Sequence, residues 1–228
     1  MSNPIINNLR QIQETIPSNV CLIAVTKTVS VEVIQTVYEA GVKNFAENKL
    51  QEAIDKQEKL KHCRDICWHF IGHLQTNKAK KAVESFEWIH SVDSLKLAQK
   101  LDFHAQQALE NGVIGKLPQV CLQIKFLPDE NKYGWSVDEF YQDLSELLNL
   151  KNLHFRGLMT ILPTGLSSEE ILSAFQGVAN VASNLRKNQY FPPDFDQLSM
   201  GMSGDYSLAI EAGATMIRLG TIIFGDRK

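Results

Sequence analysis

The first residue that could do covalent chemistry is a lysine at the end of a short apolar stretch. The stretch Cys21-Leu-Ile-Ala-Val-Thr-Lys27 is β-branched at Ile23 and Val25 and precedes a helical pattern. A run of this length and composition predicts a buried strand. Burial disfavours a charged amine, so Lys27 could lose its proton near neutral pH and form a Schiff base with a carbonyl compound. The alternative is a lysine that extends into solvent at the end of the strand.

Two segments near the carboxyl terminus indicate a site for an anion. Met200-Gly-Met-Ser-Gly-Asp205 places Ser203 and Gly204 where a predicted strand turns into a helix, and Gly220-Thr221 follows the next predicted strand. Glycines let backbone amides approach a phosphate closely, Ser203 could cap the helix, and a helix N-terminus favours negative charge. The alternative is an ordinary capped helix and a glycine turn. The occurrence of both segments after consecutive strands favours a phosphate site.

Arg218 is a charged residue within the otherwise apolar strand pattern Met216-Ile-Arg-Leu219. A buried charge without a partner is very costly, so this guanidinium needs one. Because it stays protonated, it could donate a hydrogen bond to a ring nitrogen or to an anion. The alternative is a structural salt bridge to an acidic residue such as Glu47 or Asp205.

The elements that must position these residues alternate regularly between strand and helix. Eight strands are predicted at 21–27, 42–48, 67–72, 87–92, 118–125, 153–161, 196–200 and 215–220. A helix at 4–14 opens the chain, and helices at 31–40, 49–60, 76–85, 94–111, 137–148, 168–187 and 204–211 follow the first seven strands. Strict alternation predicts a parallel sheet covered by helices.

Eight such units in 228 residues favour a closed (β/α)₈ barrel of the TIM type over an open doubly wound sheet. No Gly-x-Gly-x-x-Gly follows the first strand, as the open alternative would require. No linker divides the chain, so we expect one domain, residues 1–228, with an extra N-terminal helix.

In such a barrel the carboxyl ends of the strands share one face, where active sites form, and the loops after strands seven and eight often hold phosphate. The polar residues expected on that face are Lys27, Glu47, Asn48, His73, Ser91, Asp93, Lys125, Thr160, Ser199 and Arg218. A lysine, a phosphate site and an arginine opposite a heteroaromatic nitrogen together match pyridoxal 5′-phosphate (PLP), which carries an aldehyde, a phosphate and a pyridine nitrogen.

Blocks along nearly the whole chain resemble the signature segments of the pyridoxal phosphate homeostasis protein family (YggS/PROSC-type). They are Ala24-Val-Thr-Lys-Thr28, Phe45-Ala-Glu-Asn48, Trp68 to Lys78, Arg156-Gly-Leu-Met-Thr160, Leu198 to Tyr206 and Ala209 to Gly225. The family resembles the barrel domain of alanine racemase, a fold-type III PLP protein. This chain would lack the C-terminal β-domain of that enzyme.

The resemblance implies a set of cofactor-binding residues. It implies that Lys27 forms the Schiff base, that Arg218 faces the pyridine nitrogen, and that Asn48 and Met159 line the ring. The residues implied around the phosphate are Ser203, Gly204, Gly220 and Thr221. The loop 124–134 departs from the family pattern at Lys125 and Phe126, so nothing is carried over to it.

The resemblance implies a PLP-binding regulator of vitamin B6 and of amino-acid and keto-acid balance, without a substantial reaction of its own. An arginine that remains charged does not readily give a proton to the pyridine nitrogen, so the bound ring is a weak electron sink. One alternative is a racemase-like PLP enzyme, which needs a second acid/base group. Another is a barrel that binds a different phosphate ester and uses Lys27 for aldol-type chemistry.

The composition gives no sign of nucleic-acid or membrane partners. The formal net charge is −3, no signal-peptide pattern opens the chain, and no apolar run approaches the length of a membrane span. Cysteines at 21, 63, 67 and 121 do not form a disulfide pattern. We expect a cytoplasmic monomer that binds PLP, with PLP-dependent enzymes or regulatory proteins as possible partners.

Three further features have structural interpretations. Cys63, Cys67, His69 and His73 lack the spacing of a zinc site, so no metal is expected. His73 is expected near the pocket mouth and His69 in the core or an interface. Lys78, Lys80 and Lys81 predict a solvated helix face. Tyr206 is expected to pack on the barrel.

Overall fold

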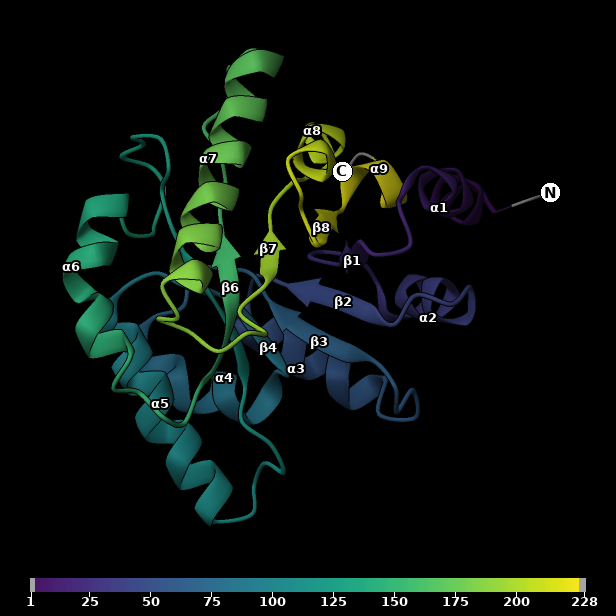
Figure 1. Ribbon diagram of the computed structural model, residues 1–228. Coiled ribbons are helices and arrows are strands. Elements are labelled where there is room, and N and C mark those ends of the chain that lie inside the picture. Colours follow the sequence, from purple (N-terminus) through teal and green to yellow (C-terminus); the bar gives the residue numbers. More distant parts are fainter. Residues whose placement is uncertain (1–2, 226–228) are drawn as a thin grey trace.

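The computed structural model describes residues 3–225 and forms a closed parallel barrel (Figure 1). The strands are β1 (Cys21–Val25), β2 (Asn44–Glu47), β3 (Cys67–Phe70), β4 (Trp88–Val92), β5 (Gln119–Gln123), β6 (His154–Met159), β7 (Gln197–Ser199) and β8 (Met216–Leu219). They are joined in sequence order, and β8 pairs with β1. The predicted TIM-type barrel is confirmed.

Helices cover the outside of the barrel and follow each strand. They are α1 (Pro4–Thr15), α2 (Val31–Glu39), α3 (Leu50–Lys59), α4 (Ala79–Ser85), α5 (Leu95–Glu110), α6 (Val137–Leu147), α7 (Ser168–Lys187), α8 (Tyr206–Glu211) and α9 (Thr221–Phe224), with a 3₁₀ turn η1 at Thr76–Lys78. Side-chain caps fix several of these starts: Ser136 and Ser167 each form a capping box with the glutamate three residues on.

Two apolar clusters divide the core. Ile23, Val25, Cys121, Met159 and Met216 belong to a small cluster inside the barrel. A much larger cluster joins the outer faces of the strands to the helices. Fully burying a Val, Leu, Ile, Phe or Met side chain contributes about 1.5–3 kcal/mol, so the helix-to-barrel layer supplies most of the favourable burial.

Strand register brings the predicted chemistry together. Ile23 of β1 pairs with Arg218 of β8, while Val25 of β1 pairs with Ala46 of β2. Continuing these registers beyond the strand ends places Lys27 between the residues that follow β2 and those that follow β8. Residues about 190 positions apart in the sequence therefore meet at one mouth because the barrel closes.

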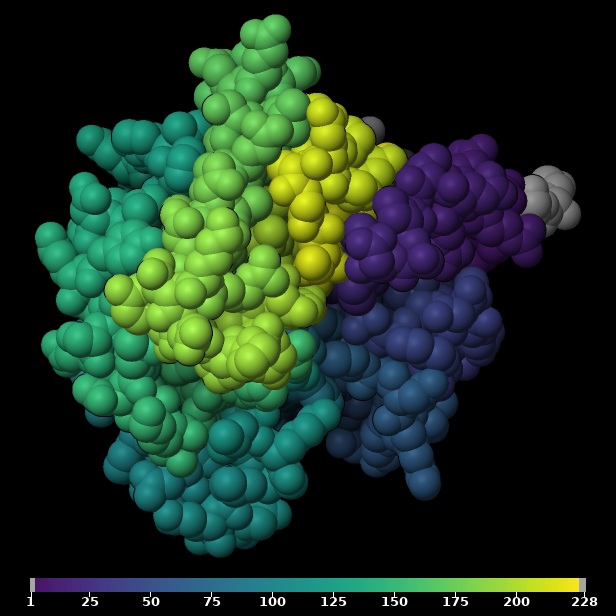
Figure 2. Space-filling model, viewed as in Figure 1, coloured from purple at the N-terminus to yellow at the C-terminus, as the bar shows by residue number. Residues whose placement is uncertain are grey.

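The extra N-terminal helix packs beside the end of the described chain. Asn8 in α1 donates a hydrogen bond from Nδ2 to the carbonyl oxygen of Ile223 in α9, at 3.2 Å. Figure 2 shows the purple N-terminal helix against the yellow C-terminal segment, which lies between it and α7. The helix thus packs against α9, the short helix that follows β8.

Two predicted helix starts differ from the structure by more than one residue. The segment predicted as helical from residue 76 begins as the 3₁₀ turn η1, and α4 starts at Ala79. The helix after β7 begins at Tyr206 rather than at residue 204, and Asp205 occupies the N-cap position. Ser203 lies in the preceding turn, where its hydroxyl accepts hydrogen bonds from the backbone N–H groups of Gly220 and Ile222 at the start of α9 and does not cap α8.

Candidate functional site

A cavity of about 380 Å³ opens at the carboxyl ends of the strands. Seven of the eight predicted cofactor-binding residues line it, from the turns after β1, β2, β7 and β8 and from β8 itself. These are Lys27, Asn48, Ser203, Gly204, Arg218, Gly220 and Thr221. The structure therefore collects residues from both ends of the chain in one pocket.

Met159 is the exception among the predicted residues. It is fully buried in the apolar cluster inside the barrel and is not among the residues that line the cavity. The cavity wall also contains apolar side chains that the sequence analysis did not select, from β1 and from the loops after β3, β6 and β7. They are Val25, Ile71, Ile161 and Met202. Their position at or just beyond strand ends was the available signal, but apolar residues there are indistinguishable from core residues by type.

The turns after β7 and β8 are joined by a serine. The hydroxyl oxygen of Ser203 lies 3.4 Å from the backbone nitrogens of both Gly220 and Ile222. Gly201 precedes this turn with a φ of +92°, and a Cβ there would lie 2.6 Å from the Cβ of Ala209. Glycine is therefore required at 201, because the conformation and the space both exclude a larger residue. The result is a compact edge of backbone amides and a hydroxyl group.

Asn48 has a buried polar atom that lacks a protein partner. Its Oδ1 makes no hydrogen bond with any described residue, and the side chain lines the cavity. Gly72 allows this placement, since a Cβ at 72 would lie 2.1 Å from the carbonyl oxygen of Asn48. Buried polar groups in proteins are nearly always hydrogen-bonded, so an unpartnered one on a cavity wall fits a bound ligand.

Arg218 is almost fully buried and is held by two uncharged acceptors. Its Nη1 donates to Ser199 Oγ at 2.7 Å and its Nη2 to the carbonyl oxygen of Thr160 at 2.9 Å. Burial lowers its pKa to about 10, and the charge of Asp205 opposes this effect. Arg218 therefore remains charged at neutral pH.

The alternative interpretation, a salt bridge from Arg218 to Glu47 or Asp205, does not apply. Glu47 bonds Lys56 instead, and Asp205 accepts the backbone N–H of Met202 at 2.5 Å. Uncharged oxygens satisfy the guanidinium without neutralising it, so its positive charge is left to act on the cavity.

Two buried histidines continue the hydrogen bonding behind Arg218. Ser199 Oγ lies 2.7 Å from His90 Nδ1, His90 Nε2 lies 2.8 Å from His69 Nδ1, and His69 Nε2 lies 3.0 Å from Asn44 Oδ1. We refer to Ser199, His90, His69 and Asn44 as the histidine chain. It runs through the barrel interior from Arg218 to the start of β2.

The burial of the histidine chain and the acceptor at Asn44 determine which of its nitrogen atoms carry protons. Burial lowers the pKa of His69 to about 3, and burial, the neighbouring His69 ring and the charge of Arg218 lower the pKa of His90 well below its ordinary range. Both rings are therefore neutral. An amide oxygen at Asn44 only accepts, so His69 carries its proton on Nε2 and His90 must donate from Nε2. The hydroxyl of Ser199 then donates to His90, which leaves its lone pairs for Arg218.

The other polar residues predicted at this face have separate partners. His73 Nδ1 lies 3.0 Å from Asp93 Oδ2, and the His73 ring stacks on Tyr133. Ser91 donates to the carbonyl oxygen of Gly72 at 2.5 Å. Lys125 lies outside the cavity, in the loop after β5.

The remaining side-chain features have structural environments. Tyr206 packs partly buried against the large core cluster, in line with its predicted packing role. In the part of the chain that the structure describes, no group of three or more His, Cys, Asp or Glu side chains is arranged to hold a metal ion.

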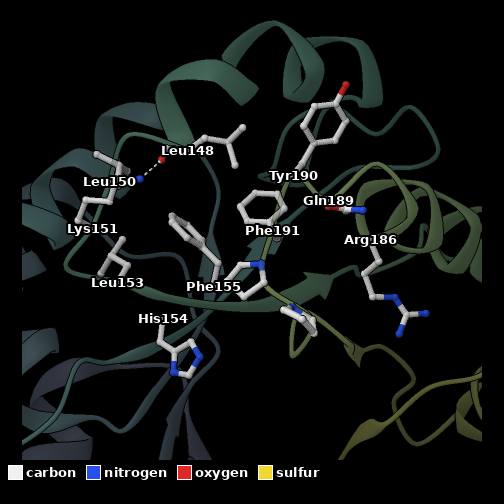
Figure 3. A pocket seen from close by; sticks show the side chains of 12 residues that line it. Leu148, Leu150, Lys151, Leu153, His154, Phe155, Arg186, Gln189, Tyr190 and Phe191 are labelled. Atoms are coloured by element: carbon white, nitrogen blue, oxygen red, sulfur yellow. Dashed lines mark hydrogen bonds between the residues drawn. The ribbon is translucent and has the colours of Figure 1, made fainter.

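A second, larger hollow of about 690 Å³ lies at the opposite end of the barrel (Figure 3). Its walls come from the residues just before and within the start of β6 and from the segment between α7 and β7, with Phe155 and Phe191 among them. None of the predicted site residues lines it. Two of its polar groups are engaged, since Lys151 Nζ donates to the carbonyl oxygen of Leu148 and His154 bonds Asp194. The chemistry of the molecule is therefore concentrated in the smaller cavity.

The fold and the cavity define a parallel α/β barrel with an amine, a guanidinium and an amide-rich edge in one pocket. Residues 2–228 match the family described as "Alanine racemase, N-terminal domain". A "Pyridoxal phosphate homeostasis protein" of Synechocystis sp. is 52% identical over 217 residues, which cover 95% of this chain and 96% of the relative.

Two solved structures show the same barrel. PipY of Synechococcus elongatus with PLP bound is 42% identical, has a TM-score of 0.89, and is matched over 97% of this chain and 100% of its own. An alanine racemase of Clostridium difficile is similar in fold, with a TM-score of 0.75 at 19% identity, over 98% of this chain and 60% of the racemase. This chain therefore belongs to the pyridoxal phosphate homeostasis protein family. Within residues 3–225, no helix is both long and apolar enough to cross a bilayer.

Proposed function

We propose that this protein binds PLP in the cavity at the carboxyl ends of the strands, with the cofactor held as a Schiff base on Lys27. Lys27 would supply the amine that condenses with the aldehyde of PLP, with loss of one water molecule. We expect Ser203, Gly204, Gly220 and Thr221 to hold the phosphate, Arg218 to face the pyridine nitrogen and Asn48 to lie at the ring, whereas Met159 is buried behind the cavity wall. When bound, PLP supplies an electrophilic aldehyde and an electron-accepting ring.

The observation that carries this proposal is the convergence of Lys27, Arg218 and the two amide-rich turns on one cavity wall. PLP has a reactive group, an aromatic nitrogen and a dianion in fixed relation, and the cavity offers a matching group for each. The unpartnered Oδ1 of Asn48 adds a site for a polar group of the ligand. The names of the relatives and the PLP-bound structure of PipY support the same ligand.

The cavity further supports a role in PLP homeostasis, and in amino-acid and keto-acid balance, rather than substantial catalysis. Among the described residues that line it, Lys27 and Arg218 are the only titratable side chains. Proton transfer at a substrate carbon on the second face of the cofactor needs another acid/base group. Arg218 stays protonated and does not readily pass a proton to the ring nitrogen, which weakens the ring as an electron sink.

The proposal also covers the domain organisation, oligomeric state, location and partners of the protein. We propose one PLP-binding domain over residues 1–228, a monomeric state and a cytoplasmic location. PLP-dependent enzymes or regulatory proteins are the proposed partners, with no role for nucleic acid or membranes. The solvated face at Lys78, Lys80 and Lys81 has no assigned role.

Titration of the purified protein with PLP tests the function. Wild type should develop the visible absorption band of an imine, and Lys27→Ala should not. Lys125→Ala is the matched control, because Lys125 also follows a strand but lies outside the cavity. It should keep the band. A wild-type protein without the band would contradict the proposal.

The racemase alternative has its own test. PLP-loaded protein is incubated in deuterium oxide with each L-amino acid, and deuterium at the α-carbon and the D-isomer are measured. We expect neither above the level of free PLP. Rapid exchange with any one amino acid would show that the protein is a racemase-like PLP enzyme.

A further inference from the structure

The residue after Lys27 has an unusual backbone conformation. Thr28 has a φ of +63°, in the left-handed region. A β-branched residue seldom adopts this region, because its Cβ crowds the backbone. Such a conformation persists only when the surroundings impose it, and it is a reason to look for function. Here it occurs directly beside the proposed Schiff-base lysine.

A partly buried ionic network holds the chain on both sides of Lys27, with Glu47 and Lys56 buried and Glu52 partly exposed. On one side, the backbone N–H of Thr28 donates to Glu52 Oε1 at 2.7 Å. On the other side, the Thr26 hydroxyl donates to Glu47 Oε1 at 2.7 Å, and Lys56 Nζ donates to the Thr26 carbonyl oxygen at 2.8 Å. Glu47, Glu52 and Lys56, which we call the ionic network, therefore contact both neighbours of Lys27.

Lys56 connects the other members of the ionic network to one another. Lys56 Nζ also lies 2.8 Å from Glu47 Oε1 and 2.7 Å from Glu52 Oε1, so its three N–H donors serve Thr26, Glu47 and Glu52. Both Lys56 and Glu47 are buried. Burial raises the pKa of Glu47, and the hydrogen bonds from Lys56 and Thr26 oppose that effect.

Glu52 is a strong hydrogen-bond acceptor for the backbone N–H of Thr28. Burial tends to raise its pKa, but hydrogen bonds from Lys56 and from the Thr28 N–H outweigh this, and the pKa is lowered. An ionised carboxylate is a stronger acceptor than a neutral one. The Thr28 amide therefore has a charged partner, fixed in turn by the ammonium group of Lys56.

We propose that Glu52, supported by Lys56 and Glu47, is a positioning residue that holds Thr28 in the left-handed conformation and so directs Lys27 into the PLP cavity. The inference rests on the proposed function. In its absence the ionic network would be only a stabilising cluster. The conformation of Thr28 distinguishes a positioning role from a purely stabilising one. A cluster that only stabilised the fold would not need to hold its neighbour in a disfavoured conformation.

The test is a double-mutant cycle between Glu52 and Thr28. Glu52→Ala removes the anchor and should weaken PLP binding about tenfold, equivalent to about 1.4 kcal/mol. Thr28→Gly alone should bind PLP nearly as well as wild type, because glycine enters the left-handed region without steric cost. In the double variant, glycine at 28 should restore much of the affinity that Glu52→Ala loses.

Two further variants separate the anchor from general charge effects. Glu52→Gln keeps an oxygen acceptor for Thr28 and should keep most of the affinity. Glu58→Ala removes an exposed glutamate from the same helix, where it pairs with Lys61, and should leave PLP binding unchanged.

A measurement on the protein without PLP provides a further test of the positioning role. Hydrogen exchange at the Thr28 amide should be slow in wild type and accelerate in Glu52→Ala. Unaltered PLP affinity in Glu52→Ala, or equal losses with threonine and with glycine at 28, would overturn the positioning role. A wild-type protein that fails to bind PLP would instead overturn the proposed function.

Discussion

Two polar groupings, one partly and one largely buried, lie near Lys27 and Arg218, and they differ in charge. The ionic network beside Lys27 combines two carboxylates with one ammonium group. The histidine chain behind Arg218 contains only neutral groups. The first can hold a strained turn, because charged hydrogen bonds are strong. The second supports a cation without neutralising it, so Arg218 keeps its charge for the cavity.

The difference shows that burial alone does not determine how a polar group is satisfied. Glu47 is buried next to a cation, since an unpaired carboxylate in the interior would be very costly. His69 and His90 are buried without a charged partner, because they can lose their own charge. Each grouping therefore has its own response to mutation and to pH.

The largest effect is expected from Lys56→Met, which leaves the Glu47 carboxylate buried without its cation. The free energy of unfolding should fall by about 3–5 kcal/mol, measured by denaturant titration. Without Lys56 the folded-state pKa of Glu47 rises further, so the loss should be greater at pH 8 than at pH 5. Lys61→Met changes an exposed lysine and is the control. A loss at pH 8 no greater than that of the control would contradict a charged network.

Acid should weaken the fold through the histidine chain. The folded-state pKa of His69 is about 3, so between pH 6.5 and 3 the unfolded chain binds a proton that the folded chain does not. Stability therefore falls as pH drops through that window, by about 2 kcal/mol for this histidine at pH 5. His69→Phe should show a smaller loss between pH 7 and pH 5, measured by unfolding at both values. An unchanged pH dependence would show that His69 is not buried in the neutral form.

Ser199→Ala removes the hydroxyl that joins Arg218 to His90. We expect a loss of about 1.5–3 kcal/mol in unfolding free energy, as for a hydrogen bond to a charged group, together with weaker PLP binding. Combination with His90→Phe should add little to the loss in PLP affinity, since both act on Arg218 through the same contact. Fully additive losses would indicate that His90 does not act through Ser199.

The smallest effect is expected at the far end of the histidine chain. Asn44→Ala removes the acceptor for His69 at a half-buried position, where water can replace it. Unfolding free energy should fall by about 0.5–1.5 kcal/mol, and PLP affinity should not change. A PLP affinity as low as that of Ser199→Ala would mean that the chain transmits its effect over its full length.

The barrel was predictable because its signals are local and repeated. Short β-branched runs alternate with helical patterns, and β1 and α7 begin at the expected residues. The carboxyl-end rule then selected the mouth of the barrel. The family resemblance implied eight cofactor-binding residues, and seven of them line the cavity at that mouth.

The two polar groupings could not be predicted from the sequence, because they depend on register and side-chain direction. His69 and His90 are on neighbouring strands and meet inside the barrel only because of how β3 and β4 pair. Lys56 reads as a surface lysine of an amphipathic helix, yet its ammonium group reaches Glu47 at the end of β2. Thr28 gives no sequence sign of a positive φ, which glycine or asparagine would have given.

The most direct test of the central claim is to locate the lysine that binds PLP. Wild-type protein is loaded with PLP, reduced with borohydride, digested and mapped by mass spectrometry. We predict one modified residue, Lys27, with the reduced cofactor attached to its Nζ. Modification of another lysine in place of Lys27, or no modified peptide at all, would contradict the claim.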